Sequence, residues 1–267
     1  MLIIGESING TIEKVGQAIL DRNKAYLRKL VTTQQECGAH CLDVNAGVAG
    51  GNELEDLPWL TQLVQEEVSI PLMIDSANPE ALKAALSVYR HSDPPILNSI
   101  SGEEAKWMKL HPVLTERECK VVVLLMDDRG IPKTIDQRMA IAQVLFARLT
   151  KMSIPPNYVY FDPLVLSVAV EPEAGIVALE MIRRLRSNYP ECHVICGLSN
   201  VSMGLPARRL INRTFLNMAI CAGLDTLLVD VRDQALLSSI YASKVLVHQD
   251  AYCMEYLKAY REKKILV

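Results

Sequence analysis

The sequence lacks a hydrophobic run that could cross a membrane, and it lacks an excess of basic residues. Its longest apolar runs, such as Val121 to Met126, fall far short of the roughly 20 residues of a membrane-spanning helix. A formal charge of −3 gives no basic field for a phosphate backbone, so we expect no nucleic-acid partner. Residues 1–6 carry neither a basic leader nor a long apolar core, and we therefore expect a cytoplasmic protein with no membrane partner.

Closely spaced cysteine ligands are also missing. The seven cysteines are scattered, and neither Cys37 with Cys41 nor Cys192 with Cys196 has the two-residue spacing typical of a metal site. If residues 193–197 form a strand, the second pair lies roughly 13 Å apart along it, too far for one metal ion. We expect free thiols in a reducing compartment, packed as small hydrophobic side chains, and no metal.

With 267 residues, 50% hydrophobic and 22% charged, the chain predicts a single domain over residues 1–267. Short apolar runs rich in β-branched residues recur, each followed by a longer segment with helical spacing of apolar residues, a pattern typical of parallel strands joined by helices. Eight such units in this length predict a closed (β/α)8 barrel, the TIM-barrel fold. The expected strands are Leu2–Ile4, Cys41–Val44, Pro71–Ile74, Pro95–Leu97, Lys120–Met126, Tyr158–Phe161, His193–Cys196 and Thr226–Val229.

Local signals agree with this division. Asn78, followed by Pro79 and Glu80, predicts a capped helix start. The segment Ser101-Gly102-Glu103-Glu104 predicts a capping box with its serine as the cap. Residues 5–10 lack the glycine spacing of a phosphate-binding loop, which argues against an open dinucleotide-binding sheet.

Polar side chains stand at the ends of the expected strands, where the strands of a barrel converge on one ligand-binding face. Each alone can equally cap a helix or start a turn, and Asp127 with Asp128 predicts an exposed turn. Asp75, Asn98 and Asp162 differ because each closes an apolar strand on a separate unit. Acceptors without a histidine base suit a flat, donor-rich heterocycle such as the 2-amino-4-oxo edge of a pterin. The strand-end residues are Glu6, Asn9, Asp43, Asn45, Asp75, Asn98, Asp127, Asp162, Ser199, Asn200 and Asp230.

Basic residues and histidines give weaker signals. The five histidines are dispersed and have no metal-ligand or acid–base spacing. Arg208, Arg209 and Arg213 begin the helix after the seventh strand, near the ligand face. Arg208 is expected there to meet either an anionic tail or a structural ion-pair partner.

Seven short motifs in order resemble those of the pterin-binding methyltransferases. The resemblance is strongest to the methyltetrahydrofolate:corrinoid protein methyltransferases of acetogenic and related anaerobic bacteria, and it runs from Met1 to near the C-terminus. The motifs are Ile4-Gly5-Glu6-Ser7-Ile8-Asn9-Gly10, Leu42-Asp43-Val44-Asn45, Ile74-Asp75-Ser76, Leu97-Asn98-Ser99, Phe161-Asp162-Pro163-Leu164, Gly197-Leu198-Ser199-Asn200-Val201-Ser202 and Leu210-Ile211-Asn212-Arg213-Thr214-Phe215.

The resemblance implies a homodimeric barrel that holds tetrahydrofolate or 5-methyltetrahydrofolate in its mouth and meets a separate corrinoid protein carrying cobalamin. It implies that Asp75, Asn98 and Asp162 hold the pterin edge and that Asn200 is the catalytic residue near N5. The cobalamin signature Asp-x-His-x-x-Gly does not occur, so the corrinoid is expected on a partner. The other cofactor-binding positions that the resemblance implies are Glu6, Asp43, Asn45, Gly197 and Ser199, with Arg208 at the benzoyl-glutamate tail.

The implied reaction moves a methyl group between N5 of the folate and cobalt by in-line displacement. Positioning then supplies much of the rate, and Asn200 would stabilise the transition state by a hydrogen bond to N5. Met203 stands where the acetogen enzymes usually carry glutamine, and a thioether cannot replace an amide. This departure favours transfer from methylcorrinoid to tetrahydrofolate in a demethylation pathway. The alternative is the opposite direction, from methyltetrahydrofolate to a corrinoid iron-sulfur protein in acetogenesis.

Other interpretations stay open. A dihydropteroate synthase-like enzyme would need a Ser-x-Arg-x-His-like element after the last strand, whereas residues 229–233 have the arginine, no histidine and two acids. Zinc-dependent homocysteine methylation would need closely spaced thiolates, and no Cys-Cys pair exists. A non-catalytic folate-binding subunit would bind folate without turnover.

Overall fold

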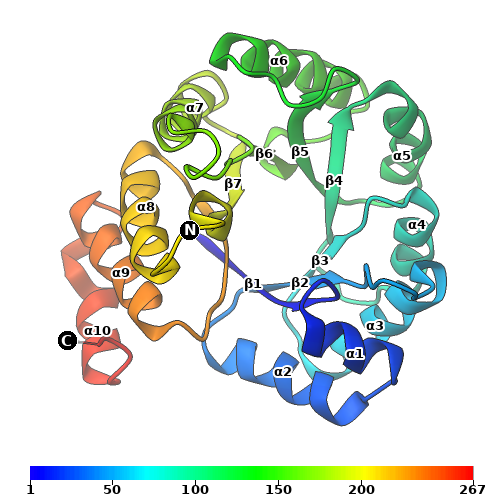
Figure 1. Cartoon of the computed structure of the whole chain (residues 1–267), viewed down its shortest axis with the longest axis horizontal. Coiled ribbons are helices and arrows are strands. Elements are labelled where there is room, and N and C mark those ends of the chain that lie inside the picture. The colour runs from blue at the N-terminus through cyan, green and yellow to red at the C-terminus, as the bar shows by residue number, and fades with distance from the viewer. Residues whose placement is uncertain (267) are drawn as a thin grey trace.

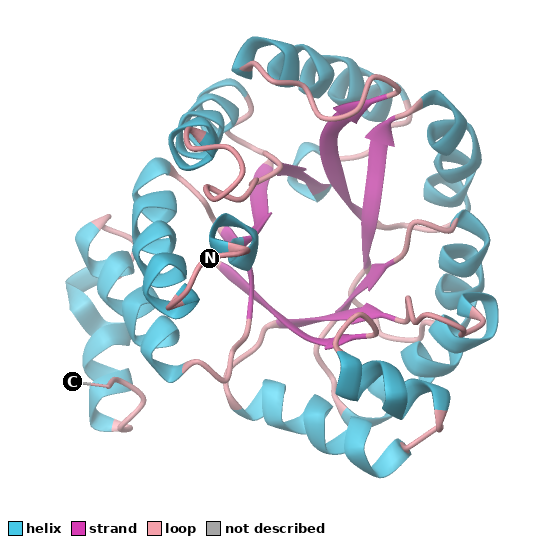
Figure 2. Cartoon of the chain, viewed as in Figure 1, coloured by secondary structure: helices cyan, strands magenta, loops and turns pink. Residues whose placement is uncertain are grey.

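Eight parallel strands close into a barrel, and helices surround it (Figure 1; Figure 2). The computed structural model describes residues 1–266. The strands follow one another around the barrel in chain order, and the last pairs with the first, so the predicted (β/α)8 barrel is confirmed. The strands are β1 (Leu2–Asn9), β2 (Cys41–Asn45), β3 (Leu72–Asp75), β4 (Ile96–Gly102), β5 (Lys120–Asp127), β6 (Val159–Asp162), β7 (His193–Gly197) and β8 (Thr226–Val229).

Helices fill every connection between strands and shield the outer face of the sheet (Figure 1). The connection from β1 to β2 holds two helices, and a last helix packs outside α9. The α-helices are α1 (Glu13–Leu20), α2 (Lys24–Glu36), α3 (Glu53–Glu67), α4 (Pro79–Val88), α5 (Glu104–Glu116), α6 (Ile135–Lys151), α7 (Ala174–Asn188), α8 (Arg208–Ala222), α9 (Gln234–Leu246) and α10 (Met254–Arg261). Three 3₁₀ turns are η1 (Pro156–Tyr158), η2 (Leu198–Ser202) and η3 (Ala251–Cys253).

Two separate apolar cores follow from the alternation of side chains along each strand. Outward-facing residues such as Leu72 and Phe161 pack against the helices and form the larger core. Inward-facing residues form a plug that closes the bottom of the barrel, so that ligands can enter only at the other end. The plug consists of Ile4, Cys41, Met73, Ile96, Val122, Tyr160 and Ile195.

The first strand is longer than the sequence pattern predicts, because it continues through an irregular register between Gly5 and Ile8. The buried side chain of Gln34 accepts a hydrogen bond from the Ser7 backbone N–H at 3.0 Å, which satisfies the interrupted ladder. A side chain at Gly5 would not fit, since a Cβ there would lie 2.5 Å from Oε1 of Gln34. Glu6 therefore lies within β1, rather than after it as expected.

The helix starts show one correct and one wrong prediction. Asn78 caps α4 by accepting a hydrogen bond from the Glu80 backbone N–H at 3.1 Å, as predicted. The predicted capping box at Ser101 is wrong, because the backbone of Ser101 stays in the β4 ladder opposite Leu124. The helix begins only at Glu104, and Ser101 instead donates to Oε2 of Glu103 at 2.8 Å.

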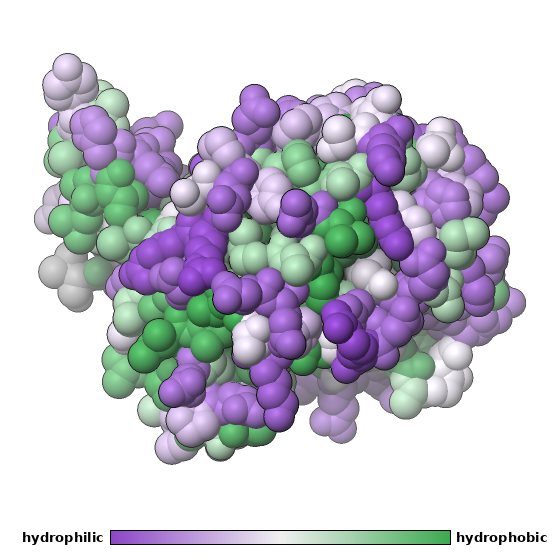
Figure 3. All heavy atoms as spheres, turned by 90° about the horizontal axis from the view of Figure 1, so that it is seen from above, coloured by the Kyte–Doolittle hydropathy of each residue, from purple (hydrophilic) through white to green (hydrophobic). Residues whose placement is uncertain are grey.

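The cysteines are free, and four of them, Cys41, Cys119, Cys192 and Cys196, are buried as small hydrophobic side chains. The same expectation is wrong for Cys221, which is exposed on α8. Within residues 1–266, no helix has the length and hydropathy of a bilayer span, and no cluster of histidine, cysteine or acidic side chains is arranged to hold a metal ion. On the side of the molecule drawn in Figure 3, hydrophilic residues interrupt the hydrophobic patches.

Candidate active site

A polar ring lies directly above the apolar plug. Strand side chains repeat with a period of two, so the residue two positions beyond each plug residue also points inward. On most strands this next inward-facing residue is polar. The register places Asn45 opposite Asp75, and Asp75 opposite Asn98, across three neighbouring strands. Of the residues predicted to follow the strands, Asp75 and Asp162 are instead the last residues of β3 and β6, and Asp43 and Asn98 lie within β2 and β4. The acids and amide of this ring are Glu6, Asp43, Asp75, Asn98 and Asp162.

Asp75 and Asp43 form an acidic pair, and the side-chain amide of Asn45 contacts Asp75. The side-chain nitrogen of Asn45 donates to Oδ2 of Asp75 at 2.9 Å, while the oxygen of Asn45 accepts from the Gly47 backbone N–H. Burial raises the pKa of Asp75 to about 6 despite this hydrogen bond. Asp43 lies deeper, and burial followed by the charges of Asp75 and Glu6 raises its pKa well above the usual value. Its Oδ1 atom has no hydrogen-bond partner among the described residues.

Asp162 closes β6 and is held by the loop that follows it. Its Oδ1 accepts from the Leu164 backbone N–H at 2.8 Å. Burial raises the pKa of Asp162 to about 6, and Leu164 and the charge of Arg138 partly oppose the shift. All four carboxyl groups of the ring, those of Glu6, Asp43, Asp75 and Asp162, thus have a raised pKa and ionise less readily than in water.

Sequence reasoning missed Arg138, which fixes this loop. Its side chain, 3% exposed, donates to the backbone oxygens of Pro132, Pro163 and Leu164 at 3.0, 2.6 and 3.0 Å. It occupies the buried face of α6 together with Ile141 and Ala142. The sequence did contain one signal of this role: Arg138 occupies a position in the helical repeat of α6 where an apolar residue is expected.

The loop after β7 carries Asn200 in the turn η2, at the rim of the barrel. Asn200 is exposed, and its side chain lies next to Gly197, since a Cβ at Gly197 would lie 3.4 Å from the Asn200 side-chain nitrogen, an ordinary contact distance. Arg208 holds this turn: Nη2 donates to the Ser199 backbone oxygen at 2.7 Å, and Nε donates to Oγ of Ser202 at 3.1 Å. No carboxylate of residues 1–266 lies in ion-pair range of Arg208. Arg208 is therefore a support of the turn that bears Asn200.

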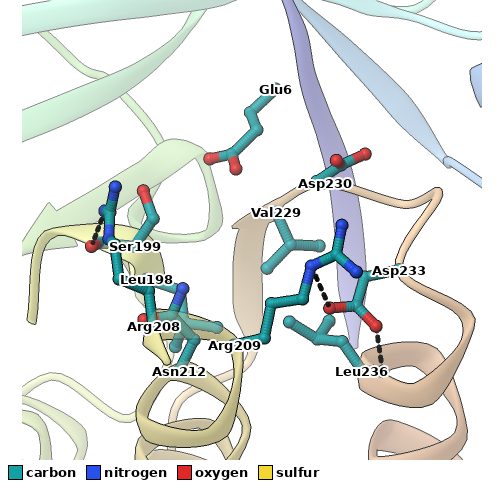
Figure 4. A pocket seen from close by; sticks show the side chains of 10 residues that line it. All are labelled: Glu6, Leu198, Ser199, Arg208, Arg209, Asn212, Val229, Asp230, Asp233 and Leu236. Carbon is teal, nitrogen blue, oxygen red and sulfur yellow. Dashed lines mark hydrogen bonds and ion pairs between the residues drawn. The ribbon is translucent and has the colours of Figure 1, made fainter. Parts of the chain in front are cut away.

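A pocket of about 290 Å³ opens beside this turn (Figure 4). Of the ten predicted site residues, three line it: Glu6, Ser199 and Arg208. Of the others, Asn200 lies in η2 and the remaining six lie on strands β2, β3, β4, β6 and β7. In Figure 4 the carboxyl group of Glu6 lies between Ser199 and Asp230. Burial and the charge of Asp230 raise the pKa of Glu6 from the usual 4.5 to about 7, against the opposing charges of Arg208 and Arg232.

Two further positions differ from the ring. Asp127 ends β5 in a turn with Gly130 and binds Arg129 at 2.6 Å, which holds its pKa below the usual value and confirms the predicted turn. Met203 is 56% exposed, and its backbone oxygen accepts from Oγ of Ser167 at 2.5 Å. Its thioether therefore lies at the surface of the loop.

Comparison with known proteins agrees with this arrangement. Residues 6–230, which run from the Glu6 position to Asp230, match the family described as pterin binding enzyme. The chain belongs to the pterin-binding enzyme family.

Within this family, the chain is 36% identical over 267 residues to the methylcorrinoid:tetrahydrofolate methyltransferase of Eubacterium limosum, covering 99% of this chain and 98% of that protein. It is 28% identical over 242 residues to the methionine synthase of Mycobacterium leprae (strain TN), covering 86% of this chain but 20% of that much longer protein. These matches confirm the resemblance that the seven motifs predicted.

Solved structures of other pterin enzymes share the barrel. The dihydropteroate synthase of Yersinia pestis has a TM-score of 0.65 at 14% identity, covering 92% of each chain. The dihydropteroate synthase of Thermus thermophilus has a TM-score of 0.62 at 18% identity, covering 88% of this chain and 91% of that one. At such low identity, these likenesses show the fold alone.

Proposed function

We propose that this chain transfers a methyl group from the cobalt of a methylated corrinoid protein to N5 of tetrahydrofolate. The Eubacterium limosum relative, similar end to end, is named for this reaction. The observation that carries the proposal is the polar ring above the plug, in which Asp75 and Asp162 end β3 and β6 and Asn98 lies within β4 opposite Asp75.

The ring fits a pterin by its donor–acceptor balance. Asp75 and Asp162 hold the N–H and amino donors of the pterin edge, and Asn98 supplies an amide between them. Burial makes these carboxylates costly without a ligand, as their raised pKa values indicate. Donors of the bound pterin offset that cost. Asn45 keeps Asp75 in position through the 2.9 Å hydrogen bond.

Asn200 acts at N5 of the folate. We assign it a hydrogen bond that strengthens as charge changes at N5 during transfer, while Arg208 fixes the turn that carries it by donating to the Ser199 backbone oxygen. When the partner is bound, its corrinoid supplies the methyl group on cobalt. The chain itself supplies no nucleophile: it orients the folate and leaves the rim open to the corrinoid.

Met203 supports the proposed direction. The position that carries glutamine in the resembling acetogen enzymes here presents an exposed thioether, which donates no hydrogen bond. Attack by free N5 needs less acid assistance than departure of N5 from a methyl group. The reverse direction is the alternative.

The proposed partner is a corrinoid protein, and a cytoplasmic homodimer is the proposed assembly. A dihydropteroate synthase-like activity has less support, because the arginine after β8 is already engaged. Arg232 donates to both carboxylate oxygens of Asp230, at 2.8 and 3.0 Å, where that chemistry would need it for a pyrophosphate.

The test combines the purified protein with methylcob(III)alamin and tetrahydrofolate without oxygen, and follows Co(I) absorbance and methyltetrahydrofolate together. We expect folate-dependent Co(I) with matching product. Asn200→Ala should slow transfer by about a hundredfold with folate affinity retained, whereas Asn188→Ala, an exposed asparagine at the end of α7, should change neither.

Each contrary result has a defined meaning. Folate binding without transfer, from free methylcob(III)alamin or from its protein-bound form, would support the non-catalytic subunit. A complete lack of folate binding would overturn the pterin assignment. Product formed only from methyltetrahydrofolate and Co(I) would reverse the proposed direction.

A further inference from the structure

The loop between β6 and α7 packs against the η2 turn that follows β7. The backbone N–H of Val168 donates to the Val201 backbone oxygen at 3.0 Å, and Oγ of Ser167 donates to the Met203 backbone oxygen at 2.5 Å. Val201 directly follows Asn200, and Met203 is the residue at which η2 ends. Two hydrogen bonds from the loop therefore hold the backbone just after Asn200.

Only the hydrogen bond from Ser167 depends on a side chain. Any residue except proline can donate a backbone hydrogen bond, whereas the bond to Met203 needs a hydroxyl group. This hydroxyl is already oriented within its own loop, because Oγ of Ser167 accepts from the Ala169 backbone N–H at 3.2 Å. The Ser167 backbone oxygen also accepts from the N–H groups of Val170 and Glu171, at 3.1 and 2.9 Å. Ser167 is thus fixed independently of the turn that it contacts.

The start of the same loop is anchored from α6. Arg138 donates to the backbone oxygens of Pro163 and Leu164, and the Leu164 backbone N–H donates to Asp162. Ser167 follows three residues after Leu164, so little chain separates it from this anchor. The loop therefore forms a short connection between Asp162, at the end of β6, and the η2 turn.

The backbone on both sides of Asn200 is held by side chains from other elements. Arg208, on α8, donates to the Ser199 backbone oxygen at 2.7 Å. Ser167 holds Met203, whose backbone N–H donates in turn to the Asn200 backbone oxygen at 3.1 Å. The side chain of Asn200 is exposed, so the direction in which it points depends on how this turn is held.

We propose that Ser167 is a positioning residue for methyl transfer, which holds the η2 turn through Met203 and so aims Asn200 at N5 of the bound folate. The inference rests on the proposed function and adds a residue to its site. Asp162 holds the pterin edge and Asn200 meets N5, so the distance between these two residues has to match one folate molecule. The loop that carries Ser167 maintains this distance, because it connects both.

Loss of the Ser167 hydroxyl should slow the transfer step without weakening folate binding. A small displacement of an aligned group costs a large factor in rate, whereas the contact of Asp162 with its loop lies at the anchored start of that loop. In single-turnover transfer from methylcob(III)alamin to saturating tetrahydrofolate, we expect Ser167→Ala to lower the rate about tenfold. Folate affinity, measured by calorimetry, should stay at its native value. Ser167→Thr keeps a hydroxyl group and should keep the native rate.

Two further comparisons separate positioning from a general loss of structure. Ser87→Ala is the matched control, because Ser87 is also exposed and donates to a backbone oxygen, that of Ala84, at 2.7 Å. It lies in the last turn of α4, at the end of that helix away from the barrel mouth, and its loss should leave the rate unchanged. In the Asn200→Ala background, Ser167→Ala should cause no further loss of rate, since Ser167 acts through Asn200.

The contrary results fall into two groups. A native rate in Ser167→Ala, a slow Ser167→Thr variant, or a full further loss in the Asn200→Ala background would overturn the inference and leave the proposed function intact. A loss of folate affinity as large as the loss of rate would also overturn it, because it would show that Ser167 supports folate binding and not the aim of Asn200. If the native protein transfers no methyl group from free or protein-bound methylcorrinoid, the proposed function fails, and the inference fails with it.

Discussion

Replacing Asp162 by asparagine should make the unliganded protein more stable while weakening its binding of folate. The carboxyl group is buried at the end of β6, and its pKa is about 6 against the usual 3.8. A folded-state pKa above that of the unfolded chain means that folding takes up a proton. The native protein therefore loses stability as pH rises between about 4 and about 6, and the asparagine variant avoids this loss.

The magnitude follows from the two pKa values. A shift from 3.8 to about 6 corresponds to a cost of about 3 kcal/mol near pH 8, where the group is ionised in both states. Near pH 4.5 the same relation gives a cost of only about 1 kcal/mol. Asparagine keeps an oxygen that can accept from the Leu164 backbone N–H, so the loop contact is preserved.

The assay is urea unfolding of native protein and variant near pH 4.5 and near pH 8, with folate affinity measured beside it. We expect Asp162→Asn to raise the free energy of unfolding by about 2 kcal/mol more at the higher pH. Asp127→Asn is the control, because Arg129 lowers the pKa of that strand-end carboxyl and its loss should not stabilise the fold. A stability gain that is absent, or equal at both pH values, would refute the argument from burial.

Three other substitutions test separate parts of the site. Asp75→Ala should weaken folate binding by about thirtyfold, since the pterin donors lose a charged acceptor, and unchanged calorimetry would remove that assignment. The raised pKa of Glu6 predicts that the free energy of unfolding of the native protein falls as pH rises from 4.5 to about 7. Glu6→Gln should remove this part of the pH dependence. Identical pH profiles of native protein and variant in unfolding experiments would contradict the raised pKa. Arg138→Met should lower the free energy of unfolding by about 3 kcal/mol, because three backbone oxygens lose their donor. It should also weaken folate binding, because the loop that positions Asp162 loses its anchor. An unchanged free energy of unfolding would show that the loop keeps its conformation without Arg138.

Local sequence features were sufficient for the barrel and for the members of the polar ring. Asp75 and Asp162 end apolar strands as predicted, and the convergence of parallel strand ends in a closed barrel follows from the repeat itself. The prediction that Asn98 closes its strand is wrong, because β4 continues along β5 to Gly102. The boundaries were less accurate where tertiary contacts decided them. β1 continues past Glu6 because Gln34, a residue of a distant helix, satisfies the Ser7 backbone.

Roles that depend on packing could not be deduced from residue type. Arg208 could have met an anion or an acid, and only the fold shows it donating to the turn that carries Asn200. Arg138 gave no functional motif, yet it anchors the loop after Asp162. Hydrogen-bond partners of a long side chain come from elements distant in sequence, so their identity is set by the packing of the helices.

The sequence by itself determined the fold, the family and the polar character of the barrel mouth. Each of these depends on residue periodicity and on short motifs, which can be recognised from the order of residues alone. Only the tertiary structure decided how acidic each carboxyl group is, since the pKa depends on burial and on neighbours from other strands. It also decided which basic side chains reach the mouth. Arg208 and Arg213 share one helix, but Arg208 lines the pocket beside Glu6 and Arg213 does not, because that pocket forms where β1, β8 and α9 close against the first turn of α8.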